Sequence, residues 1–460
     1  MPDISRAVIA HFKCREDMMP MELAGELCGK PGFFQLGKSG ATGYARCSAF
    51  SPAAQFVDDL PDVSHHITVE DGISKLPFDP SEAIEAIRCE RYMRSEDGAT
   101  KSFSFGRVQQ AAYYAVRPLL PVSARRHLQR FSLRDWKRRP FPRWPVDTSV
   151  EQIMENLVKL ALKSSGRDRM PFIWFWPEGA RAAALVTHDV ETGAGRDFCT
   201  QLMDIDDDYD VKASFQVVPD KRYIVSERYL EEIRRRGFEV NVHDLNHDGR
   251  LFKDFAEFER RAEAINRYRV SFRARGFRAG ALYRNPDWMN LLDFEYDLSV
   301  PNVAHLDPQR GGCCTIFPYF IGNVLEIPLT ATQDYSLYYI LRDYSLNLWK
   351  AQVAKILDRH GVMSFIIHPD YTTKKREQRV YRDLLEYLSG LRRSAGLWVT
   401  RPGEVNDWWR QRSRMTLVGS GDQWEITGEG RERARIAFAS LQQGELVYQI
   451  EECWAHAASA

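Results

Sequence analysis

The chain changes pattern at about residue 150, where short apolar segments begin to alternate with amphipathic ones. Apolar runs predict strands at 182–186, 213–218, 238–242, 276–278, 324–329, 362–367 and 397–400. Apolar residues at helical spacing predict helices at 153–161, from Ser226 onward, at 255–265 and at 353–357. About seven strands alternating with helices indicate a parallel α/β sheet, which we expect to close as a barrel.

The two ends of the chain follow other patterns. Residues 1 to about 115 mix apolar stretches with turn-rich pieces and show no regular alternation, which predicts a separate accessory region. Short strands are predicted near the C-terminus at 423–427, 434–439 and 446–450, with turns between them. The predicted organisation is an accessory N-terminal region at 1–150, a barrel at 151–412 and a small antiparallel β appendage at 413–460.

Charge narrows the range of partners. Lys plus Arg and Asp plus Glu number 63 each, so no overall field favours a polyanion, and we expect no nucleic-acid partner. Locally, residues 117–143 carry nine basic side chains and one acid, interleaved with aromatic residues. This segment is expected either to contact an anionic membrane surface or acidic glycan, or to act as an arginine-rich linker with buried stems.

Composition also bears on location. Hydrophobic residues make up 44% of the 460 residues, which is enough for a packed core, yet no stretch of eighteen apolar residues occurs. The eight cysteines are scattered without paired-ligand spacing. We therefore expect a cytoplasmic protein with reduced thiols.

Three predicted strands end in residues that can do chemistry. The first runs into Asp189 and Glu191, the third into His243 and His247, and a late one into His368. Strand ends of a parallel barrel converge at one face, so we expect these side chains to lie together. The histidine pair has four-residue spacing, which is expected to place both rings on one face of a helical turn.

Such a pair leaves room for a carboxylate and water around a divalent ion, with Zn²⁺ expected first and Co²⁺, Mn²⁺ or Ni²⁺ also suited. Two acids at spacing two can divide the work, one binding the metal and the other accepting a proton from water. The competing interpretation is two ordinary histidines and two solvated acids.

Four segments together resemble the polysaccharide deacetylase family with the NodB-homology domain, carbohydrate esterase family four. They are Thr187-His188-Asp189-Val190-Glu191, His243-Asp244-Leu245-Asn246-His247, Gly276-Phe277-Arg278-Ala279-Gly280 and Phe365-Ile366-Ile367-His368-Pro369. The resemblance covers roughly residues 170 to 410 in the family's order of motifs, and it implies a deformed (β/α) barrel.

The resemblance also implies roles for the site residues. Asp189 is implied as catalytic base, Arg278 as its partner and His368 as the general acid that protonates the leaving amine. The implied metal ligands are His243, His247 and Glu191. An aspartate is expected to orient His368, and both Asp297 and Asp334 fall in the right interval.

The chain departs from the family's pattern at three positions. Val190 stands where the family has its metal-binding acid, so that the acid is displaced by one residue to Glu191. Asp244 replaces a hydroxyl residue, and Ala279 stands where a proline is usual.

The expected function is therefore a metal-dependent hydrolase that removes N-acetyl groups from a sugar of a polysaccharide or glycan precursor. Two alternatives stay open at this point. One is a glycan-binding or scaffold protein that has lost turnover, and the other is a hydrolase of a different non-peptide C–N bond.

Overall fold

The computed structural model describes residues 4–37, 40–94, 131, 133, 135–421 and 423–451. Contacts divide the chain into a barrel unit, residues 87–148 and 181–407, and a flanking unit, residues 1–86, 149–180 and 408–460. The basic segment expected to contact a membrane or an acidic glycan falls largely at 117–130, 132 and 134, outside the described residues.

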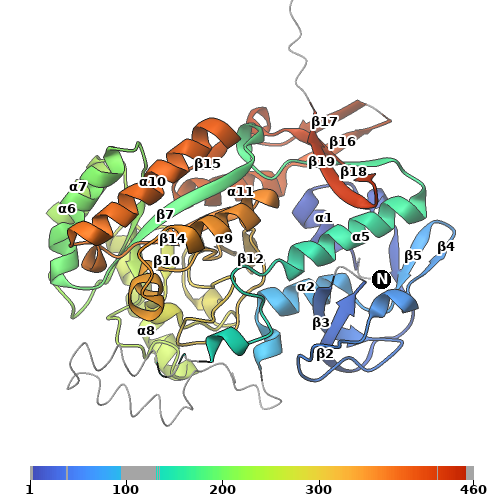
Figure 1. Cartoon of the computed structure of the whole chain (residues 1–460), viewed down its shortest axis with the longest axis horizontal. Coiled ribbons are helices and arrows are strands. Elements are labelled where there is room, and N and C mark those ends of the chain that lie inside the picture. The colour runs from blue at the N-terminus through green and yellow to red at the C-terminus, as the bar shows by residue number, and fades with distance from the viewer. Residues whose placement is uncertain are drawn as a thin grey trace, which may run out of the picture. The chain divides into compact units, whose positions relative to one another are not determined.

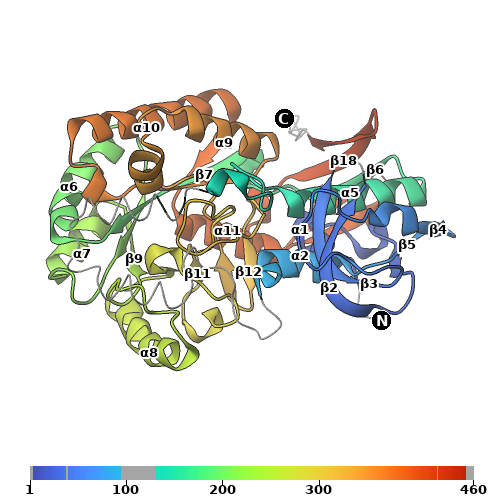
Figure 2. The same ribbon diagram turned by 60° about the horizontal axis from the view of Figure 1, so that its bottom comes forward.

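A curled sheet forms the centre of the barrel unit (Figure 2). Its strand order is β12-β13-β11-β10-β9-β8-β7-β14, and β15 also pairs with β7. Every pairing is parallel except that of β12 with β13. The strands are β7 (Ala182–Val190), β8 (Ser214–Val217), β9 (Glu239–His243), β10 (Gly276–Arg278), β11 (Tyr296–Asp297), β12 (Tyr319–Ile321), β13 (Val324–Glu326), β14 (Val362–Ile366) and β15 (Leu397–Val399).

The segment that follows β13 joins the two ends of this sheet. On one side the backbone N–H of Leu329 donates to the carbonyl of Val300, just after β11. On the other side the N–H of Ala331 donates to the carbonyl of Ser364 in β14 over 3.2 Å. The continuation of β13 thus bonds to β14 at the opposite edge of the curled sheet, which confirms the expected deformed (β/α) barrel.

Five helices lie around the outside of the sheet (Figures 1 and 2). They are α6 (Gly193–Asp207), α7 (Glu227–Arg235), α8 (Phe255–Ser271), α9 (Asn347–Asp358) and α10 (Lys375–Ala395). Thr192, Ser226 and Asp254 cap the first three, each accepting a backbone N–H of the first turn. The predicted helix start at Ser226 is thereby confirmed.

Close packing between β10 and β11 depends on a glycine. A Cβ at Gly276 of β10 would come closer than 3.0 Å to the ring of Tyr296, which is fully buried between strands. The hydroxyl of Tyr296 donates to Glu239 over 2.9 Å and accepts from Asn241.

The flanking unit is built from all three of its chain segments. Its elements are α1 (Arg6–Phe12), β1 (Met21–Leu23), β2 (Cys28–Leu36), β3 (Ala41–Cys47), β4 (Thr68–Glu70), β5 (Ile73–Leu76), most of α2 (Pro80–Arg88), α5 (Ser149–Ser165), β6 (Arg169–Ile173), the end of α11 (Pro402–Arg414), β16 (Thr416–Ser420), β17 (Gln423–Thr427), β18 (Ile436–Gln442) and β19 (Glu445–Ile450). Strand β6 pairs antiparallel with β18, and α5 packs against β3 and β5.

Most predicted elements are present, but the boundaries of the parts differ. All seven strands expected at 182–400 occur within a few residues of their predicted limits. The barrel unit resumes at Arg181 rather than beginning at residue 151, because α5 and β6 pack and pair within the flanking unit. By contacts, the segment of the predicted appendage groups with that unit.

Two further observations concern the helices and the cysteines. Among the residues that the structure describes, no helix combines the length and hydropathy that a transmembrane span requires. Six cysteines in the described ranges are buried: Cys14, Cys47, Cys89, Cys199, Cys313 and Cys314.

Candidate metal and catalytic site

Four parallel strands bring the predicted site residues to one end of the barrel. Asp189 lies in β7 with Glu191 just beyond it, His243 ends β9, Arg278 ends β10, and His368 follows β14. All of these side chains are buried except that of Glu191, which is 16% exposed. The structure thus gathers every site residue that the sequence predicted.

Strand alternation explains why an acid displaced by one residue still reaches the site. Thr187 and Asp189 both receive hydrogen bonds from Nη1 of Arg278, at 2.6 and 2.7 Å, so alternate residues of β7 face inward. His188 faces outward, where its Nε2 lies 3.0 Å from a carboxylate oxygen of Asp206 in α6. Glu191 continues the inward series beyond the strand.

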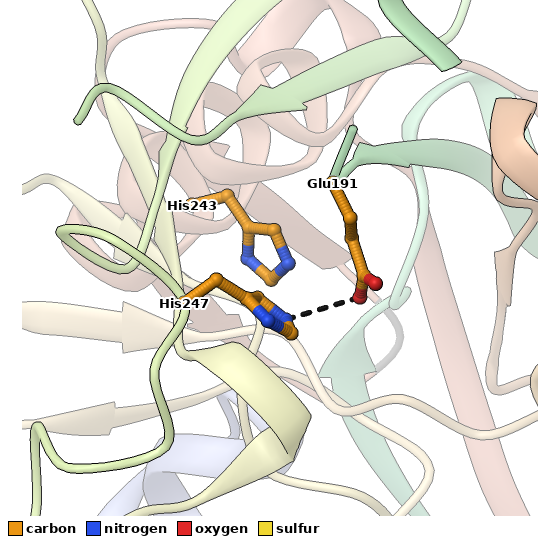
Figure 3. A group of neighbouring side chains, drawn as sticks. All are labelled: Glu191, His243 and His247. Atoms are coloured by element: carbon orange, nitrogen blue, oxygen red, sulfur yellow. Dashed lines mark ion pairs between the residues drawn. The ribbon is translucent and has the colours of Figure 1, made fainter. Parts of the chain in front are cut away.

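Glu191, His243 and His247 form a cluster suited to a metal ion (Figure 3). One ligand atom from each lies within 4.8 Å of the others. The Nδ1 of His243 lies 3.0 Å from the carbonyl oxygen of Arg278, which makes Nδ1 the donor and leaves Nε2 free to bind a metal. The Nε2 of His247 lies 3.0 Å from Oε1 of Glu191.

Whether a metal fits this cluster can be judged from the hydrogen-bond partners of the histidine ring nitrogens. Within the described part of the chain, Nε2 of His243 and Nδ1 of His247 are buried without a hydrogen-bond partner, and Nε2 of His247 faces the Glu191 carboxylate. Buried polar atoms without partners are costly, and imidazole nitrogens beside a carboxylate are ordinary ligands of divalent metals. The three residues therefore fit a divalent ion.

The pair His243 and His247 does not lie on a helical turn, so that part of the prediction is wrong. The chain leaves β9 in a loop in which Asp244 and His247 adopt φ angles of 57° and 52°. These left-handed positions bring the two rings to a centroid distance of 4.8 Å. Arg261 of α8 supports the loop with two hydrogen bonds to Asp248, of 2.7 and 2.9 Å.

Asp189 is held in its ionised form. Burial favours the neutral acid, but the charges of Arg278 and of the nearby histidines outweigh it, so the pKa of Asp189 lies below its usual value. Oδ1 accepts from Arg278, and Oδ2 lies 3.8 Å from Nε2 of His243. An ionised carboxylate beside the metal ligands is placed to accept a proton from water.

His368 is held in its protonated form by Asp334. Burial opposes the charge, but the Asp334 carboxylate raises the pKa of His368 well above the usual value. Nδ1 of His368 lies 2.6 Å from Oδ1 of Asp334, and the backbone N–H of His368 donates to Oδ2 over 2.8 Å. Its Nε2 lies 3.6 Å from Oε1 of Glu191, on the side of the metal ligands.

Of the two aspartates that the sequence left open, only Asp334 contacts His368 among the described residues. Asp297 instead accepts hydrogen bonds from Ser299 and lies beside Glu326, and burial raises the pKa of both carboxyl groups. The sequence offered no flanking pattern to decide between the two. The deciding contact joins residues 34 positions apart.

Comparison with known proteins gives neighbours by structure alone. No family model matches the chain, and no curated protein matches it. A protein from Mycobacterium smegmatis described as a polysaccharide deacetylase shares 18% identity over 55% of this chain and 98% of its own, with a TM-score of 0.43. A protein from Pseudomonas aeruginosa PAO1, also described as a polysaccharide deacetylase, shares 14% identity over 51% of this chain and 93% of its own, with a TM-score of 0.41.

A peptidoglycan deacetylase from Bacillus subtilis shares 13% identity over 50% of this chain and 93% of its own, with a TM-score of 0.33. The solved structures similar to this chain are thus polysaccharide and peptidoglycan deacetylases. At these TM-scores the likeness carries no weight for activity, which has to be inferred from the site.

Proposed function

We propose that the chain is a metal-dependent hydrolase that removes N-acetyl groups from a sugar of a polysaccharide or glycan precursor. The observation that carries the proposal is the arrangement of a paired carboxylate and a paired histidine around one cluster of metal-binding side chains. Asp189, held by Arg278, lies 3.8 Å from His243, and His368, held by Asp334, lies 3.6 Å from Glu191. Amide hydrolysis needs this combination, because water must lose a proton while the leaving amine gains one.

The metal site would be formed by Glu191, His243 and His247. A divalent ion bound there, Zn²⁺ first and Co²⁺, Mn²⁺ or Ni²⁺ as alternatives, supplies Lewis acidity toward the amide carbonyl and toward water. Burial lowers the pKa of His243, which keeps its ring neutral as a ligand must be. Burial also acts on His247, but the charge of Glu191 outweighs it and raises the pKa, so metal binding would release a proton.

The side chains of the site divide the remaining work. Asp189 takes the proton of the attacking water, and Arg278 prevents the carboxylate from turning away by holding Oδ1 at 2.7 Å. His368 then gives its Nε2 proton to the departing amine. Asp334 keeps that proton on the ring and fixes the ring's orientation through Nδ1.

The choice of an N-acetylated saccharide as substrate is supported by the motif resemblance described above. The chemistry of the side chains themselves suits any unactivated amide, which is why hydrolysis of another non-peptide C–N bond is the main alternative. A glycan-binding protein without turnover would have no use for a paired base and acid. The departure at Val190 does not support that alternative, because Glu191 supplies the carboxylate instead.

We also propose a cytoplasmic location with reduced thiols, which the scattered spacing of the eight cysteines supports. Contact with a membrane or an acidic glycan through 117–143, and an accessory role for the N-terminal residues, stay predictions.

Metal content tests the proposal. After dialysis and elemental analysis, wild-type protein is expected to hold about one divalent ion per chain, and a His243→Ala/His247→Ala variant close to none. The exposed pair His65 and His66 offers a matched control, since replacing both leaves the cluster intact. Equal metal in the wild type and the His243/His247 variant would remove the site.

A further inference from the structure

Asp370 lies two residues after His368, at a position to which the proposed mechanism gives no role. It belongs to the short helix η10 (Pro369–Tyr371), which packs against α6. Its side chain, which is half-buried, reaches the first turn of α6. There it contacts the residues that directly follow β7.

The carboxylate of Asp370 accepts hydrogen bonds from two consecutive residues, Glu191 and Thr192. Oδ2 accepts the backbone N–H of Glu191 over 3.2 Å, and Oδ1 accepts the hydroxyl of Thr192. The same hydroxyl caps α6 by accepting the N–H of Gly195. Asp370 therefore bonds both to Glu191 and to Thr192, the residue that caps α6.

Arg222 holds Glu191 from the other side. Its Nε donates to the carbonyl oxygen of Glu191 over 3.1 Å. The backbone of Glu191 is thus fastened at its N–H and at its carbonyl, although the residue lies beyond the end of β7 and has no strand partner there. A displaced acid needs such support, because strand pairing ends at Val190 and no longer fixes its backbone.

Gly195 provides the space for this contact. A Cβ at Gly195 would come closer than 3.0 Å to Cγ and to both carboxylate oxygens of Asp370. Gly195 lies inside α6, where alanine would otherwise be the better helix former. Its lack of a side chain is explained by the approach of Asp370 rather than by the backbone.

We propose that Asp370 is a positioning residue that sets Glu191 in the metal site, and that Gly195 is required because only glycine admits the carboxylate. The inference rests on the proposed function, since it assigns Asp370 to the support of a metal ligand. It also ties the metal site to the general acid, because His368 and Asp370 belong to one short segment. Outer contacts of this kind typically change metal affinity by about 10–100-fold.

The test is a double-mutant cycle in which the measured quantity is the affinity for Co²⁺. Metal-free protein is titrated with Co²⁺, and binding is monitored by visible absorption. Gly195→Ala and Asp370→Ala are each expected to weaken Co²⁺ binding by about 10-fold or more. In the Asp370→Ala background, Gly195→Ala is expected to have almost no further effect, because the carboxylate it would displace is gone. Gly390→Ala in α10 is the matched control, since a Cβ there meets nothing within 4 Å.

Thermal unfolding of the metal-free proteins separates positioning from simple damage. Gly195→Ala is expected to stay folded and to unfold at about the same temperature as Asp370→Ala, because both changes remove the same hydrogen bonds of the carboxylate. Wild-type Co²⁺ affinity in Gly195→Ala, or losses that multiply in the double variant, would overturn the inference while the proposed function stands. If the wild-type protein itself binds no Co²⁺, the proposed function fails and this inference fails with it.

Discussion

Replacing Arg261 with methionine is expected to weaken metal binding without unfolding the barrel. Arg261 lies in α8 with its side chain only 5% exposed, and it holds Asp248 by two hydrogen bonds and Glu257 by one of 2.6 Å. Asp248 directly follows His247, so this contact fixes the end of the loop that carries the second histidine ligand. Methionine keeps most of the apolar stem and removes the charged fork.

The size of the effect follows from the backbone of that loop. Asp244 and His247 both have positive φ, a conformation that costs on the order of 1 kcal/mol or more for each non-glycine residue. Without Arg261 both residues can relax, and metal binding then has to restore about 2 kcal/mol of strain. At about 1.4 kcal/mol per tenfold, the dissociation constant should rise by about 30-fold.

Calorimetric titration of metal-free protein with Zn²⁺ measures this directly, with circular dichroism to show that the variant is folded. Arg260→Met is the matched control, because Arg260 is the neighbouring residue of α8, is 66% exposed and pairs with Glu257. Its removal should change the affinity less than twofold, as expected for an exposed ion pair. Wild-type affinity in Arg261→Met, or an equal loss in Arg260→Met, would refute the reasoning.

Three further predictions concern the proposed roles and the core. Glu191→Gln should lower the bound metal, whereas Asp189→Asn should keep the metal and lose about 100 to 10,000-fold in turnover, because a general base contributes that much. Metal analysis and rates on the same preparations check both, and the opposite pattern would exchange their roles. Rate against pH should be bell-shaped, with an acidic limb below the usual range of Asp189, whose pKa is lowered, and an alkaline limb above the usual range of His368, whose pKa is raised. Asp334→Asn should move the alkaline limb to lower pH by about 1–3 units, and an unmoved limb would separate Asp334 from the acid. Gly276→Ala should lower the free energy of unfolding by about 1–3 kcal/mol through crowding in the barrel, as measured by urea denaturation, and wild-type stability would show that the barrel yields there.

The barrel strands could be predicted because they are buried on both faces and read as continuous apolar runs. All nine residues of β7 are buried, as are the five of β14. Strand β11 was missed because two residues are too few to show a pattern, and β12 was missed as well. Residues 151–180, which contain most of α5 and all of β6, were included in the predicted barrel because periodicity identifies an element but not the sheet against which it packs.

The candidate site was predictable as far as residue type and strand ends determine it. The displaced acid Glu191 joins the cluster because a period of two along β7 returns every second side chain to the same face. The conformation of the histidine pair was not predictable, since four-residue spacing looks helical and the left-handed positions at Asp244 and His247 leave no sequence signal.

The supporting residues depend on contacts that the sequence does not display. Asp370 meets Glu191 across 179 positions of the chain, and Asp334 meets His368 across 34. Arg261 looks like one more basic residue of an exposed helix until the structure shows its burial. Each of these pairs forms only when separate strand ends come together.

The central claim is that this site hydrolyses an N-acetyl amide with the help of a divalent metal, and acetate release from N-acetylated oligosaccharides tests it most directly. Wild-type protein should be measured as purified, after removal of metal by a chelator, and after Zn²⁺ is restored, with Asp189→Asn as a metal-loaded control. The account predicts release by the first and third preparations and almost none by the stripped protein or by Asp189→Asn. Acetate release that survives removal of the metal, or that Asp189→Asn supports at the wild-type rate, would contradict it.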